Sequence, residues 1–239
     1  MRLCKITVKT SLPARGVDNF FYNKNLPKPL GLIVAKTLHS VFRFWILQGL
    51  PISAYSGMEL SLTKMMGQLQ DAGNVTTLAG YLEILDQCAL LTGLQKYAND
   101  EARKRGSMPK YQVYNNALLT AYKGRTFVTD RTDTLVWGRW VESAVGAHLL
   151  SMADELDYQV YYWRDPARNK DEKDKEVDFV LLRDGEVTAI EVKSGRRGMN
   201  SGLPAFVEAF HPKRSFVVGT GGVNLEDFLG CEVEEIFRH

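Results

Sequence analysis

The chain has 239 residues, 45% of them hydrophobic and 24% charged, which is the composition of a globular protein long enough to bury a core. Its formal net charge of +2 excludes a global electrostatic attraction to nucleic acid or membranes, so any basic footprint must be local. The 3 cysteines have no CxxC spacing, which argues against a disulfide framework or a zinc site. They fit a reducing compartment, and we expect a cytoplasmic protein.

Residues 1–55 form a poorly defined N-terminal segment without a chemical signature or a secretory leader. Its apolar stretch is interrupted by Lys36, His39, Arg43 and Pro51, so it falls short of a membrane-spanning segment. We expect a partly helical segment, with a buried helix around residues 33–47, and no membrane partner.

Residues 56–125 have the element order of a winged-helix module. An apolar stripe within SLTKMMGQLQ predicts a first helix, and a turn follows at Asp71, Gly73 and Asn74. The segment VTTLAGYLEILDQCALL predicts a second helix with Thr76 or Thr77 as N-cap. Extended pieces LLTGLQKY and PKYQVYN come next and would form the two-stranded wing.

The charges of this module are distributed poorly for reading DNA sequence. No Lys or Arg occurs between Asp71 and Gln95, so the second helix would meet phosphates with the wrong sign. The basic side chains lie in the predicted wing instead: Lys96, Arg103, Lys104, Arg105 and Lys110. Arg103, Lys104 and Arg105 could hold a nucleic-acid backbone, or they could be ordinary solvated loop charges. The pattern favours a protein-docking or spacing module over a sequence reader.

Residues 126–239 alternate between helical and extended patterns. A helix is predicted in WGRWVESAVGAHLLSM, a strand in YQVYYWR, and a β-hairpin in EVDFVLLRDGEVTAIEVKSG. A short helix in LPAFVEAFH and a strand in RSFVVGTGG complete the order α-β-β-β-α-β. This order predicts a mixed sheet flanked by helices, an α/β (α+β) fold.

The hairpin carries the charges that raise a functional question. If Asp184-Gly185 is its two-residue turn, Val177 and Phe179 share one apolar face, and Asp178 lies opposite Glu191 on the other. Two opposed carboxylates destabilise a strand pair unless something compensates them. A divalent cation such as Mg²⁺, held by Asp178 and Glu191, is one solution. A solvated sheet end neutralised by Lys193 is the other.

At these residues the sequence resembles a known family. Asp178 followed by Glu191-Val192-Lys193 looks like the PD-(D/E)XK nuclease core, which implies a restriction-endonuclease-like sheet and Mg²⁺-dependent phosphodiester cleavage. The resemblance implies metal ligation by Asp178 and Glu191, with Lys193 and the helical Glu142 as catalytic residues. Arg196 and Arg197 follow Lys193 and could contact one or two phosphates, or they could serve only the solubility of the loop.

A wider resemblance covers roughly residues 56–230. In order and spacing they look like the uncharacterised C-terminal region of a prokaryotic AAA-type ATPase family, in which a winged helix precedes a nuclease-like domain. No G-x-x-x-x-G-K-[ST] occurs in this chain, so we expect no ATP site and no ATPase activity. Two functions stay open. One is Mg²⁺-dependent phosphodiester cleavage or nucleic-acid processing, with DNA as a candidate substrate. The other is a non-catalytic binding or regulatory module of an ATPase, which docks to DNA or to protein, such as a separately encoded ATPase.

Overall fold

The computed structural model describes residues 55–67, 73–98, 107–119, 127–167, 169, 172–195 and 202–238, and all of them belong to one compact unit, Leu47–His239. The predicted helix at 33–47 lies outside the described residues, as do five of the predicted phosphate-contacting residues: Arg103, Lys104, Arg105, Arg196 and Arg197.

A seven-stranded mixed sheet organises the described residues, in the order β1-β3-β2-β4-β5-β6-β7. Its strands are β1 (Met58–Glu59), β2 (Leu91–Lys96), β3 (Lys110–Val113), β4 (Gln159–Asp165), β5 (Lys175–Arg183), β6 (Glu186–Lys193) and β7 (Arg214–Gly219). The β2–β4 and β6–β7 pairs are parallel and the other neighbours are antiparallel. The predicted mixed sheet flanked by helices is confirmed.

Helices precede, interrupt and follow the strands. They are α3 (Leu62–Met66), α4 (Val75–Gln87), α7 (Phe127–Thr132), α8 (Thr134–Leu150), α9 (Gly202–Phe210), α10 (Leu225–Gly230) and the 3₁₀ helix η2 (Val233–Phe237). The short elements β1, α7, α10 and η2 were not predicted, because two to six residues carry too little periodicity to be recognised.

The second predicted helix begins earlier than its sequence suggested. Asn74, and not Thr76 or Thr77, is the N-cap of α4, because its side-chain oxygen accepts the Thr77 backbone N–H at 2.8 Å.

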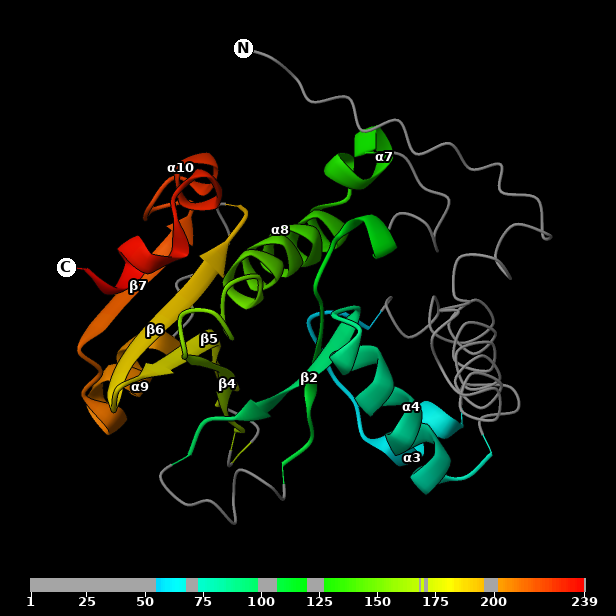
Figure 1. Cartoon of the computed structure of the whole chain (residues 1–239). Helices are drawn as coiled ribbons and strands as arrows, with labels where there is room; N and C mark the ends of the chain where they lie inside the picture. Colours follow the sequence, from blue (N-terminus) through cyan, green and yellow to red (C-terminus); the bar gives the residue numbers. More distant parts are fainter. Residues whose placement is uncertain are drawn as a thin grey trace, which may run out of the picture. The chain divides into compact units, whose positions relative to one another are not determined.

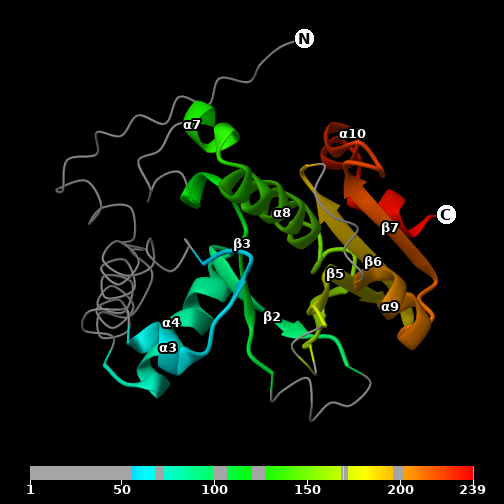
Figure 2. The ribbon, with the colours of Figure 1, turned by 180° about the vertical axis from the view of Figure 1, so that it is seen from behind.

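Two apolar layers cover the central strands. On one face α8 packs Val145 and Leu149 against Phe179, Leu181 and Ile190. On the other face α9 contributes Phe206, which packs with Trp163, Val177 and Val180. Figures 1 and 2 show the long helix α8 and the shorter α9 beside the central strands, with α10 next to β7. The sheet is therefore buried on both faces where the predicted site lies.

The sheet continues across the boundary predicted between residues 125 and 126. Strands β2 and β4 pair in parallel at Gln95–Tyr161 and Lys96–Tyr162. An ion pair of 2.7 Å between Arg164 Nη1 and Glu59 Oε1 also joins the two segments. The domain boundaries at 55 and 125 stay predictions.

The hairpin has the predicted turn and register, but the side chains of β5 do not alternate between the two faces of the sheet as predicted. Asp184 and Gly185 both have positive φ, at 52° and 78°, and the ladder pairs Arg183 with Glu186 up to Phe179 with Ile190. A register shift opposite Tyr161 and Trp163 makes a β-bulge in β5. Val177 consequently packs with Val180 on the α9 face and not with Phe179, which corrects the simple alternation predicted for this strand.

Within the described ranges, no helix is long and apolar enough to cross a membrane.

Candidate functional site

The buried ammonium group of Lys110 lies at the centre of an acidic cluster. Its Nζ is 2.7 Å from Glu142 Oε1, 2.8 Å from Glu176 Oε1 and 3.6 Å from Asp178 Oδ1. These three carboxylates come from α8 and β5, whereas Lys110 comes from β3, and its side chain is only 2% exposed. We call these four residues the Lys110 cluster.

A polar contact between α8 and β3 brings the cluster together. Gln112 Nε2 donates to the Ser143 carbonyl oxygen at 2.9 Å, and the Ser143 and Ser56 hydroxyls are 2.8 Å apart. Gly146 permits the close approach, since a Cβ there would fall 2.5 Å from Gln112 and 2.8 Å from Phe179. Glu142 and Lys110 precede Ser143 and Gln112 on their elements, so this packing places them next to each other.

Opposing electrostatic effects determine the charge of Lys110. Burial disfavours its ammonium form, but the carboxylates of Glu142, Asp178 and Glu176 outweigh burial and raise the Lys110 pKa above its usual value. The ammonium therefore stays charged at any physiological pH.

Asp178 occupies the point where the β5–β6 ladder ends. Its Oδ2 accepts the Val192 backbone N–H at 2.7 Å, and the ladder stops one residue before the predicted Asp178–Glu191 pair. Burial, together with the nearby Glu142, raises the pKa of the Asp178 carboxyl to about 7, although Lys110 and the Val192 N–H oppose the shift. The Asp178 carboxyl is therefore easier to protonate than an exposed aspartate.

Glu191 has different partners from Asp178. Its carboxylate accepts the Leu203 backbone N–H at the start of α9 and lies 3.5 Å from Lys193 Nζ. Burial raises the pKa of Glu191, while Lys193 opposes that shift. Because neighbouring Ala189 packs on the α9 face, alternation along β6 directs Glu191 to the same face.

The structure thus brings together part of the predicted set. Glu142 and Asp178 share Lys110, and Glu191 and Lys193 form a separate pair. Within the described residues, no group of three or more His, Cys, Asp or Glu side chains is arranged to hold a metal ion.

Lys110 and Glu176 are the site residues whose roles the sequence did not reveal. Lys110 was counted among the exposed basic residues of the wing, but its ammonium is buried in the acidic cluster and cannot reach a nucleic-acid backbone. One signal was available, since Glu176 and Asp178 are two apart on β5, and a cation beside two such carboxylates is favourable. Which lysine supplies it depends on the strand order, which the sequence does not encode locally.

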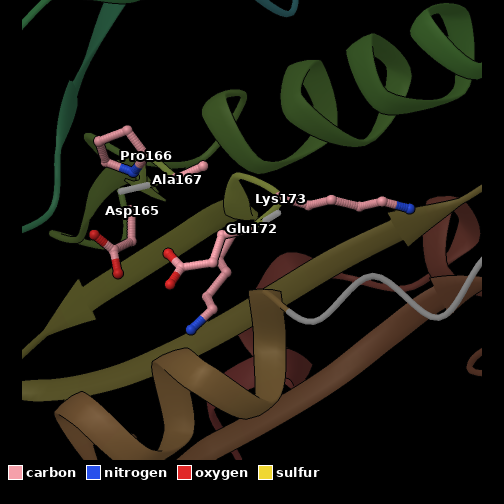
Figure 3. A pocket seen from close by; sticks show the side chains of 6 residues that line it. Asp165, Pro166, Ala167, Glu172 and Lys173 are labelled. Atoms are coloured by element: carbon pink, nitrogen blue, oxygen red, sulfur yellow. The ribbon is translucent and has the colours of Figure 1, made fainter. Parts of the chain in front are cut away.

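A polar pocket opens beside the first residue of β5, Lys175. It has a volume of about 210 Å³ and is lined by Asp165, Pro166, Ala167, Glu172, Lys173 and Lys175. Figure 3 shows the Lys173 side chain extending away from the Asp165 and Glu172 carboxyl groups. Two acidic and two basic residues line it, so it has no net preference for a ligand of either charge.

Residues 137–231 match the family described as a domain of unknown function, DUF4143. The match covers less than half of the chain and includes Glu142, Glu176, Asp178, Glu191 and Lys193. Lys110 lies before the DUF4143 region, so the cation of the Lys110 cluster comes from outside it.

No curated protein matches the chain. Among solved structures, it is similar to protein VC1899 from Vibrio cholerae with 16% sequence identity and a TM-score of 0.24. The similarity covers 77% of this chain and 46% of that protein, so the chain spans about half of its length. A TM-score this low carries no conclusion about fold or function.

Proposed function

We propose that the chain is a non-catalytic binding module, in which Lys110 takes the electrostatic role that a divalent cation would have in a nuclease. The position of the Lys110 ammonium, 2.7 to 3.6 Å from three carboxylates, is the observation that carries this proposal.

The donor groups are poorly arranged for a shared magnesium ion. Mg²⁺ requires oxygen ligands in near-octahedral geometry at about 2.0–2.1 Å. In joint ligation by Asp178 and Glu191, the metal ion would share the Glu191 carboxylate with the Leu203 N–H and the Lys193 ammonium. It would also place the metal ion near the buried Lys110 ammonium, which repels it.

The resemblance of residues 56–230 to the C-terminal region of AAA-type ATPases suggests the kind of partner. On this proposal the chain docks onto an ATPase domain, and its fold presents a surface instead of an active site. The acidic second helix agrees with docking to protein, because Glu83 and Asp86 on α4 are unfavourable beside phosphates.

A Mg²⁺-dependent nuclease is the second candidate, and the charge balance favours it. Three carboxylates surround one ammonium, so the Lys110 cluster has surplus negative charge when all its acids are ionised. In that role Asp178 and Glu191 would hold Mg²⁺, which would supply Lewis-acid stabilisation of phosphate charge. Lys193, 24% exposed, would orient water or substrate, and Glu142 would assist.

One experiment separates the two candidates. Full-length protein is incubated with single- and double-stranded DNA and RNA over a titration of Mg²⁺ or Mn²⁺, beside Asp178→Ala and Lys193→Ala. We expect no metal-dependent cleavage above the level of the two variants, and no saturable Mg²⁺ binding by calorimetry. Cleavage by wild type that both substitutions abolish would overturn the non-catalytic proposal and establish the nuclease.

A further inference from the structure

A cleft opens where strands β2 and β4 separate. In the described part of the sheet their parallel pairing is confined to Gln95–Tyr161 and Lys96–Tyr162. Before these pairs, β2 is paired with β3 from Leu91 to Leu94, and β4 is paired with β5 at Gln159 and Val160. The facing edges of the two strands diverge, and a cavity of about 270 Å³ lies between them.

The cleft has an apolar wall and an acidic opening. Leu94, Leu150 and Tyr158 belong to the core between α8 and the sheet and supply the wall. Asp86 from α4 and Asp154 from the turn after α8 supply the charges. None of the described residues that line the cleft is a Lys or an Arg.

Tyr114 fixes the acidic opening. Its hydroxyl donates to Asp86 Oδ1 at 2.9 Å and accepts a hydrogen bond from the Thr92 side chain. Burial raises the pKa of Tyr114, and the charges of Asp86 and Asp154 raise it further. Both carboxylates therefore lie within electrostatic range of one hydroxyl, at the same opening.

We propose that this cleft binds an arginine side chain of a protein partner. A volume of about 270 Å³ lies below the range of about 300–1,000 Å³ of small-molecule sites, and suits one long side chain. The apolar wall accommodates the methylene stem, and the two carboxylates accept hydrogen bonds from the head group. A guanidinium group suits this opening better than an ammonium, because it is planar, weakly hydrated and can stack on Tyr114.

The inference names the chemistry of the partner and rests on the proposed docking function. Its residues are separate from the Lys110 cluster, so the two proposals fail in different experiments. Metal-dependent cleavage would overturn the docking proposal, whereas arginine binding at the cleft is tested separately by the titration below. Failure of arginine to bind, without any cleavage, would remove this inference alone.

The test is a titration of the full-length ¹⁵N-labelled protein with N-acetyl-arginine amide, followed by NMR. The matched ligand is N-acetyl-citrulline amide, which has the same shape without the charge. We expect saturable shifts at Thr92, Gly93, Gln159 and Val160, with a Kd on the order of millimolar for so small a ligand.

Substitutions at the two aspartates test whether their carboxylates bind the arginine. Asp86→Asn combined with Asp154→Asn should weaken arginine binding at least about tenfold, since it removes both charged acceptors. Glu208→Gln, which removes one exposed carboxylate from α9 on the other face of the sheet, should leave the affinity unchanged. Equal binding of citrulline, unchanged affinity in the double variant, or no saturable shift at these residues would each overturn the proposal.

Discussion

Replacing Lys110 with Met should be among the most destabilising single changes on the β3 strand. The substitution keeps much of the side-chain volume but removes the cation from between Glu142, Glu176 and Asp178. At an effective dielectric constant of about 20, each of the contacts at 2.7 and 2.8 Å is worth about 6 kcal/mol of Coulomb attraction. Desolvation of the ammonium and repulsion among the carboxylates offset most of that attraction. Loss of one partner from a buried ion pair costs about 3–5 kcal/mol net.

For a chain of this size, about 3–5 kcal/mol corresponds to a Tm lower by about 6–20 °C. The assay is urea unfolding followed by tryptophan fluorescence, with Lys213→Met as the matched control. Lys213 pairs with Glu186 at the surface, with side chains 49% and 51% exposed, so that substitution should cost only about 0–1 kcal/mol.

The reasoning would be refuted by equal, small losses in the Lys110 and Lys213 variants. If the Lys110→Met protein does not fold, the double variant with Glu142→Gln gives a second test. It should recover part of the stability, because it removes a carboxylate that would otherwise stay buried without its cation.

Three further predictions concern stability, and chemical denaturation measures each. Gly146→Ala should destabilise the fold by about 1–3 kcal/mol, because its new Cβ overpacks against Gln112 and Phe179. Gly80→Ala has open space around its Cβ and should stabilise the fold by about 0.5–1 kcal/mol. A similar change in both variants would contradict the packing of α8. The raised pKa of Asp178 means that the folded chain holds a proton which the unfolded chain releases above about pH 4, so Asp178 makes stability fall as pH rises from about 4 to 7. Asp178→Asn cannot titrate and should flatten that slope; an unchanged slope would show that Asp178 is ionised throughout. Asn74→Ala should cost about 1 kcal/mol by removing the N-cap of α4, while Thr76→Ala should cost less than half as much.

Local sequence signals predicted much of the fold. The Asp184-Gly185 turn specified the hairpin register, because both residues accept the positive φ that a tight turn requires. Helical spacing of apolar residues located α8, whose buried positions include Val141, Val145 and Leu149.

The candidate site was harder to predict because it depends on two non-local features. The bulge in β5 changes the face of Val177, and nothing in the surrounding alternation marks its position. Lys110 reaches the acidic residues only because β2 pairs with β4, which brings a strand from one predicted module beside the other. Without knowledge of that pairing, a lysine near an Arg- and Lys-rich loop is predicted to be a surface charge.

The distance along the chain between Lys110 and its partners has a consequence for synthesis on the ribosome. Lys110 and Glu176 are separated by 66 positions, so the β2–β3 hairpin leaves the ribosome well before β4 or β5 exists. During that interval β2 is an uncovered edge strand, and edge strands of this kind are templates for aggregation. A chain that stops after α8 is therefore expected to be insoluble, even though its three strands, β1, β2 and β3, and its helices could form.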